Sequence, residues 1–196
     1  MQKLIFKSIQ NSSRTDSPNS FTIIFFVALG VRLINLAISD FSPDAMLLED
    51  AAMYWKAVVK NQTFLDDALL EIFSQTERMP GYLLFLAAFV GIFGENFLPI
   101  LVIQSVIDSF TCVLIAALGR YVYPKYYGIF GWLAAFWPNL FIHSGQILGD
   151  SLFVFFFVWF LLSFTGLLHK PTILAAVVTG AAIGLATLVR PTTQFI

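Results

Sequence analysis

Six apolar runs, separated by more polar segments, constrain the fold of this chain more than any other feature. They occupy about 21–39, 81–93, 97–119, 128–148, 151–168 and 172–189. A helix needs about 20 residues to cross ~30 Å of hydrocarbon, and five of the six runs come close to that length. The run 81–93 is too short, which favours an interfacial or re-entrant helix. The pattern predicts an all-α, polytopic integral membrane protein.

Composition supports this fold class and excludes several functions. Of the 196 residues 58% are hydrophobic and only 12% are charged, against roughly 25% charged in soluble domains. A net charge of −1 gives nucleic acid no basic surface to bind. The single cysteine, Cys112, cannot form an internal disulfide. No Walker loop, GxSxG, CxxC or HExxH motif occurs, so the sequence indicates no cofactor and leaves a divalent metal ion open.

Lysine and arginine placement predicts the orientation of the runs. The polar tail 1–20 carries three basic residues and should stay cytoplasmic. The run 21–39 is too long for a cleaved signal peptide, so we expect an uncleaved signal anchor. If 81–93 lies at the interface and the other five runs cross, residues 40–96 form the first extracytoplasmic loop. The basic loops, including 120–127, are then all cytoplasmic. This topology gathers one set of charged residues on the outer face: Glu49, Asp50, Arg78, Asp150 and Arg190.

The outer segment 40–80 is predicted to hold two short amphipathic helices, at 45–59 and 64–74. On a helix Asp50 and Tyr54 share a face, because they are four residues apart, while Glu49 points elsewhere. A carboxylate partly desolvated at a membrane interface can act as a general base. The alternative is a solvated helix start, where acidic residues favour the positive end of the helix dipole.

Other charged residues also have two interpretations. Arg78 precedes Pro80 and could hold a phosphate, or could extend to the interface or pair with Glu77. Asp150 and Arg190, at the ends of two runs, are either site residues or ordinary terminal anchors.

Two charges lie inside the apolar runs. Arg32 is predicted to extend outward or to pair with an outer acid. Asp108 lies in mid-run, should face the bundle interior, and is predicted to be neutral or bonded to Gln104 or Ser105, with a role in packing. A transporter would instead use Asp108 as an ion or proton site.

Several loose motifs, in this order, resemble one enzyme family. They are a first apolar run with an arginine, the outer Glu49-Asp50 and Tyr54, R-x-P-G-Y-x-L-F-L-A (78–87), F-G-E-N, V-I-Q-S, Phe136-Trp137-Pro138, Asp150, and G-L-A-T-L-V-R-P-T (184–192). Together, over residues 21–194, they resemble the N-terminal module of GT-C type glycosyltransferases that use lipid-linked sugars. The most similar members are the dolichyl-phosphate-mannose protein mannosyltransferases and the aminoarabinose lipid A transferases.

The resemblance implies sugar transfer from a polyprenyl-phosphate donor to an acceptor on the extracytoplasmic side of the cell membrane. It implies that Asp50, or Glu49, is the catalytic acid. It also implies that Arg78, Asp150, Arg190 and Tyr54 bind the donor and its phosphate.

Family members continue well past the R-P motif, so we expect 21–196 to be an incomplete module. The chain would then be a fragment, a truncated gene product, or a reduced module to which a partner chain supplies the missing helices. The alternative functions are a non-catalytic membrane scaffold or assembly subunit and a transporter subunit.

Overall fold

The computed structural model describes residues 19–38, 80–93, 96, 98–143, 145–190 and 192, and within these ranges it contains helices and no strand. In chain order the elements are α2 (Asn19–Ile38), α5 (Pro80–Phe93), α6 (Leu98–Val122), the 3₁₀ turn η1 (Pro124–Tyr126), α7 (Tyr127–Ala135), α8 (Pro138–His143), α9 (Asp150–His169) and α10 (Ile173–Val189).

Three of the described helices are long and apolar enough to cross a membrane, which agrees with an all-α membrane protein. These are α2, from Ser20 to Ile38, α6 and α9. Helices α5 and α10 are apolar but shorter. At 1.5 Å per residue, the 17 residues of α10 extend about 26 Å. Five complete spans were predicted, whereas only three of the described helices have the length and composition of a span.

The largest correction concerns residues 128–148, where a single spanning helix was predicted. The structure has two short helices instead, because α7 ends at Ala135 and α8 begins at Pro138. Pro138 has no backbone N–H to donate and its ring would clash with the preceding turn, so a helix cannot run through it unbent. Phe136 and Trp137 form the corner, where their N–H groups still bond to the carbonyls of Trp132 and Ala134.

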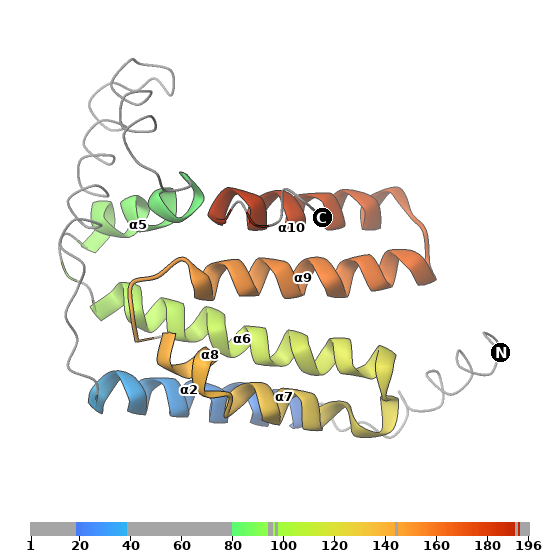
Figure 1. Cartoon of the computed structure of the whole chain (residues 1–196), viewed down its shortest axis with the longest axis horizontal. Helices are drawn as coiled ribbons and strands as arrows, with labels where there is room; N and C mark the ends of the chain where they lie inside the picture. Colours follow the sequence, from blue (N-terminus) through green and yellow to red (C-terminus); the bar gives the residue numbers. More distant parts are fainter. Residues whose placement is uncertain are drawn as a thin grey trace, which may run out of the picture.

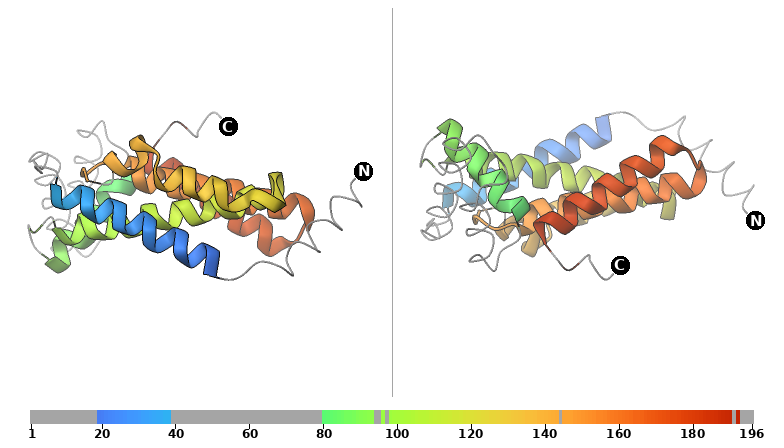
Figure 2. Two further views of the ribbon diagram at one scale, coloured as in Figure 1. Left: turned by 90° about the horizontal axis from the view of Figure 1, so that it is seen from below. Right: turned by 90° about the horizontal axis from the view of Figure 1, so that it is seen from above.

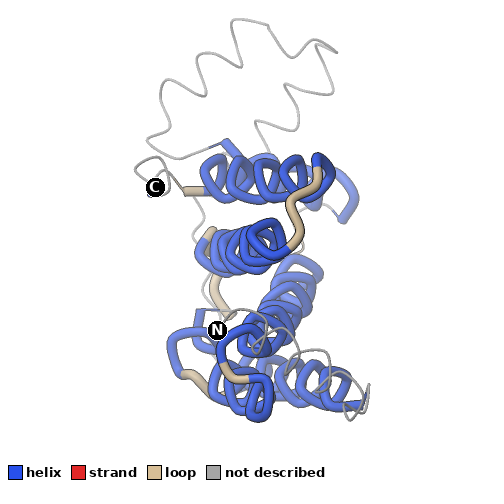
Figure 3. Tube along the Cα trace, turned by 90° about the vertical axis from the view of Figure 1, so that its right-hand side faces the viewer, coloured by secondary structure: helices blue, strands red, loops and turns tan. Residues whose placement is uncertain are grey.

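Helix α6 is the centre of the bundle. Half of the residues in its most apolar stretch are buried, against 17% in the corresponding stretches of α2 and α9. It contacts α2 and α7 on one side and α9 on the other, and α10 packs on α9 (Figure 1). Viewed from below, α2 and α7 lie side by side against α6 (Figure 2). Viewed nearly end-on, the helices form a stack rather than a ring (Figure 3).

The helices alternate in direction, which gives the bundle two distinct ends (Figure 1). The N-terminus of α2, the α6–α7 connection and the α9–α10 connection lie at one end, called here the basic end. It carries Arg120, Lys125 and Lys170. The opposite end, called here the Asp150 end, holds the C-terminus of α2, helix α5, the α8–α9 connection and the last turn of α10. Helix α5 lies at this end, and α6, which follows it in the chain, also begins there. Helix α5 therefore does not run the length of the bundle.

Helix α5 packs tightly at the Asp150 end. Tyr82, Leu83, Leu86 and Ala87 are buried in a cluster with residues of α6 and α9. A β-carbon on Gly81 would lie 2.7 Å from the backbone carbon and oxygen of Leu188. The absent side chain at Gly81 therefore lets α5 approach the backbone of α10.

The buried interior of the bundle contains an ion pair between two helices. Arg32 of α2 donates from Nε to the carboxylate of Asp108 in α6, and both side chains are almost completely buried. Its Nη1 donates to the carbonyls of Ala28, at 3.0 Å, and of Ala135 in α7, at 3.4 Å. Its Nη2 lies 3.2 Å from the sulfur of Cys112. One guanidinium thus links α2, α6 and α7.

This arrangement corrects the sequence-based partners of both charges. Arg32 pairs with a carboxylate inside the bundle rather than with an outer acid or the interface. Asp108 pairs with an arginine of another helix, whereas a neutral carboxyl or a bond to its helical neighbour Gln104 or Ser105 was predicted. The predicted orientation of Asp108 toward the interior is confirmed, since its side chain is 0–1% exposed.

The close approach at Gly81 can be tested with a matched glycine. Gly81→Ala should lower the free energy of unfolding by about 1–3 kcal/mol, because the new methyl group meets backbone that cannot rotate away. Gly30→Ala, where nothing lies within 4 Å of the new β-carbon, should be neutral or stabilising. Denaturant unfolding in detergent measures both. Equal effects at the two positions would contradict the packing of α5 on α10.

The buried ion pair predicts a characteristic mutational cycle. Asp108→Leu or Arg32→Met alone should each cost about 3–5 kcal/mol of unfolding free energy, because each removes one member of a buried pair. The double variant Arg32→Met/Asp108→Leu should recover most of that loss, since no unpaired charge remains. Simple addition of the two single losses in the double variant would show that the residues do not interact.

Candidate functional site

The Asp150 end presents an exposed pair of opposite charges. Asp150 is the first residue of α9 and Arg190 caps the C-terminus of α10. The short connection between the two antiparallel helices brings these distant residues together, and Arg190 Nη1 donates to Asp150 Oδ1. The Asp150 side chain is 37% exposed and the Arg190 side chain is 50% exposed. An exposed pair of this kind contributes only about 0–1 kcal/mol to stability.

The ion pair forms one wall of an open groove of about 400 Å³. The other lining residues come from the α7–α8 corner and the first turn of α9: Trp137, Asn139, Leu140, Phe153 and Val154. Small-molecule sites have volumes of ~300–1,000 Å³ and combine apolar walls with a few polar groups. This groove offers a cation, a carboxylate, an amide and aromatic surface.

The break before Pro138 explains why an indole faces this groove. If residues 128–148 formed one helix, Trp137 would be an ordinary position along it. The corner instead leaves Trp137 56% exposed, and Trp137 and Asn139 line the groove together. The prediction of a continuous helix thus missed Asn139 as a site residue. The Trp137-Pro138 dipeptide was the signal that could have found it.

Hydrogen bonds from one buried side chain join α5, α6 and the α8–α9 connection next to the groove. Gln104 of α6 donates from Nε2 to the hydroxyl of Tyr82 in α5, at 3.2 Å, and to the carbonyl of Leu148, at 3.0 Å. Gln104 is buried, so these bonds fix the α8–α9 connection just before Asp150. A β-carbon on Gly149 would lie 3.3 Å from the Tyr82 ring, which shows how closely this connection packs on α5.

The protonation state of Tyr82 follows from its surroundings. Burial raises the pKa of its hydroxyl far above the ordinary value, the bond from Gln104 opposes this, and the Asp150 carboxylate raises it further. The hydroxyl therefore stays protonated at all physiological pH values. Tyr82 is a neutral hydrogen-bonding group beneath the site and not a base.

The structure describes only part of the predicted site. Asp150 and Arg190, predicted on one face, are brought together as an ion pair. Glu49, Asp50, Tyr54 and Arg78 lie outside the described residues, as do the helices predicted at 45–59 and 64–74. Within the described ranges, no group of three His, Cys, Asp or Glu side chains could hold a metal ion.

Comparison with protein-family models, with curated proteins and with solved structures finds no match to this chain.

Proposed function

We propose that this chain is part of a membrane glycosyltransferase that moves a sugar from a polyprenyl-phosphate donor to an acceptor at the Asp150 end of the bundle. The observation that carries the proposal is the exposed Asp150–Arg190 pair in a groove with an indole wall. The sequence resemblance to GT-C enzymes independently names the same two residues as site residues.

The position of the groove is consistent with this role. The chain leaves the described part at Ile38 and re-enters it at Pro80, both at the Asp150 end (Figure 1). The segment with Glu49, Asp50 and Arg78 is therefore attached where the groove lies. In the proposed topology this end is extracytoplasmic, and the basic end faces the cytoplasm, as lysine and arginine placement favours. The protein is then a multi-pass protein of the cell membrane.

Each residue has a role in the proposed reaction. Asp50, or Glu49, accepts a proton from the acceptor hydroxyl or amine as it attacks the anomeric carbon. The bond from that carbon to the phosphate oxygen breaks, and the lipid phosphate leaves as an anion. Arg78 and Arg190 stabilise that anion with charge-assisted hydrogen bonds. Asp150 orients the Arg190 guanidinium, and Trp137 offers a flat apolar surface to the sugar or to the first isoprene units.

Both alternative functions have weaker support. A transporter would need Asp108 to exchange ions or protons, but its carboxylate holds Arg32 in the buried interior. A non-catalytic scaffold does not require an exposed ion pair in a groove. A partner chain that completes the bundle is compatible with the enzymatic proposal.

The phosphate site can be tested without knowing the sugar. We expect Arg190→Met and Arg78→Met to weaken binding of polyprenyl phosphate by roughly 10-fold or more, because a charge-assisted hydrogen bond is worth about 1.5–3 kcal/mol. Lysine at either position should restore part of the affinity. Binding of the uncharged polyprenol should not change.

Lys170→Met is the matched control, because it removes a basic residue from the opposite end of the bundle. It should bind polyprenyl phosphate as the unaltered chain does. Equal affinities for all variants would refute the phosphate site.

The catalytic acid requires a transfer assay. In membranes containing the protein, Asp50→Asn should lower the transfer rate by ~10²-fold or more, because it removes the general base but preserves the size of the side chain. Affinity for polyprenyl phosphate should be retained. A transfer rate near that of the unaltered protein would assign the role of general base to Glu49. Normal transfer rates for both Asp50→Asn and Glu49→Gln would exclude this mechanism.

A further inference from the structure

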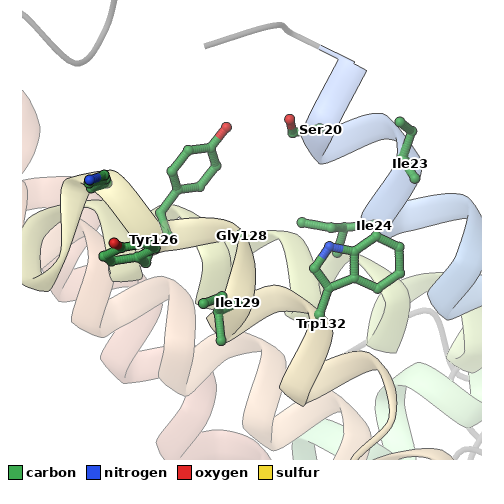
Figure 4. A pocket seen from close by; sticks show the side chains of 9 residues that line it. Ser20, Ile23, Ile24, Tyr126, Gly128, Ile129 and Trp132 are labelled. Atoms are coloured by element: carbon green, nitrogen blue, oxygen red, sulfur yellow. The ribbon is translucent and has the colours of Figure 1, made fainter. Parts of the chain in front are cut away.

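A second groove, of about 410 Å³, lies at the basic end. It is bounded by the start of α2 on one side and by η1 and the first two turns of α7 on the other. In Figure 4, Ser20, Ile23 and Ile24 lie on the α2 wall, and Tyr126, Ile129 and Trp132 lie on the other. The lining also includes Lys125, Tyr127 and Gly128. None of the residues that line this groove lines the Asp150–Arg190 groove.

The mouth of the groove is positively charged. Lys125 is exposed, with its ammonium 5.4 Å from the Tyr126 ring centroid. The Arg120 guanidinium lies 4.4 Å from the Phe21 ring and 4.6 Å from the Tyr127 ring, just behind the groove wall. Helix α7 begins at Tyr127 without a side-chain cap, so the positive end of its dipole adds to this field.

The remainder of the groove is apolar. Ile23 and Ile129 are each about half exposed in it, and Trp132 is 36% exposed. Tyrosine and tryptophan side chains favour the headgroup level of a membrane, where the ring contacts acyl chains and its polar atom contacts water. Basic pockets between helices at this depth suit anionic lipid headgroups.

We propose that this groove binds one anionic phospholipid, with Lys125 at the phosphate and an acyl chain between α2 and α7. Charge complementarity selects the anionic headgroup, and the apolar walls select a lipid over a free phosphate. The site does not depend on the proposed glycosyltransferase activity, because it lies at the other end of the bundle.

Trp132 allows a site-specific test. The chain has four tryptophans, so replacing the other three with phenylalanine (Trp55, Trp137 and Trp159) leaves Trp132 as a reporter in the groove. Reconstitution into phosphatidylcholine vesicles with a minor fraction of brominated lipid then reports binding as quenching. We expect brominated phosphatidylglycerol to bind about fivefold more strongly than brominated phosphatidylcholine, as expected for one lysine near the headgroup.

Matched variants identify the source of the preference. Lys125→Gln should abolish it, Lys125→Arg should keep it, and Lys170→Gln, at the same end but outside the groove, should also keep it. A protein with Trp159, which lines neither groove, as its only tryptophan should show no preference. Circular dichroism on each variant establishes that the helices are intact.

Three results would overturn the proposal. One is equal quenching of Trp132 by both brominated lipids. Another is a preference for brominated phosphatidylglycerol that persists in Lys125→Gln, or that Lys170→Gln abolishes as fully as Lys125→Gln does. Either result would indicate a general attraction to a charged bilayer. The third is displacement of brominated phosphatidylglycerol by millimolar inorganic phosphate, which would identify a free anion as the occupant.

Discussion

The ion pair between Arg32 and Asp108 is the interaction on which the rest of the bundle depends. Each charge is buried, and neither is tolerable there without the other. The pair holds α2 against α6, and the additional bond to Ala135 holds the end of α7, which Pro138 determines, against both helices. Because α7 ends there, the corner at Phe136 and Trp137 follows at a defined place. The groove beside Asp150 thus inherits its position from a charge pair in the interior.

The two ends of the bundle have different chemistry because each helix reverses the direction of the previous one. Residues separated by two antiparallel helices and the short connection between them return to the same end, as Asp150 and Arg190 do. Arg120 and Lys125 lie at the other end, each beside aromatic rings. A protein that lies between two different aqueous compartments would be expected to show this asymmetry. The groove at one end is lined by an ion pair and an amide, and the groove at the other end by a lysine and aromatic rings.

The sequence predicted the helices well where hydrophobicity alone decides the structure. The bounds of α2, α5, α6, α9 and α10 follow the apolar runs closely, because burial in lipid or protein rewards any uninterrupted apolar helix. The run 128–148 was predicted wrongly because hydropathy does not register the missing N–H of Pro138. The pairing of Asp150 with Arg190 could be anticipated from helix alternation. The pairing of Arg32 with Asp108, 76 residues apart, could not, because no local spacing encodes which helix faces which. The remaining predicted site residues lie outside the described part of the chain.

The buried arginine also has a consequence for biogenesis. In the proposed membrane setting, α2 leaves the ribosome before α6, and an arginine within a spanning helix disfavours insertion, by about 2.5–3.5 kcal/mol at the helix centre. Its counter-ion is on α6, which is synthesised only after the long segment between Ile38 and Leu98. Until α6 emerges, α2 should remain beside the translocon or an insertion chaperone rather than diffuse into lipid. The release of the first helix is therefore timed by the synthesis of the third described one.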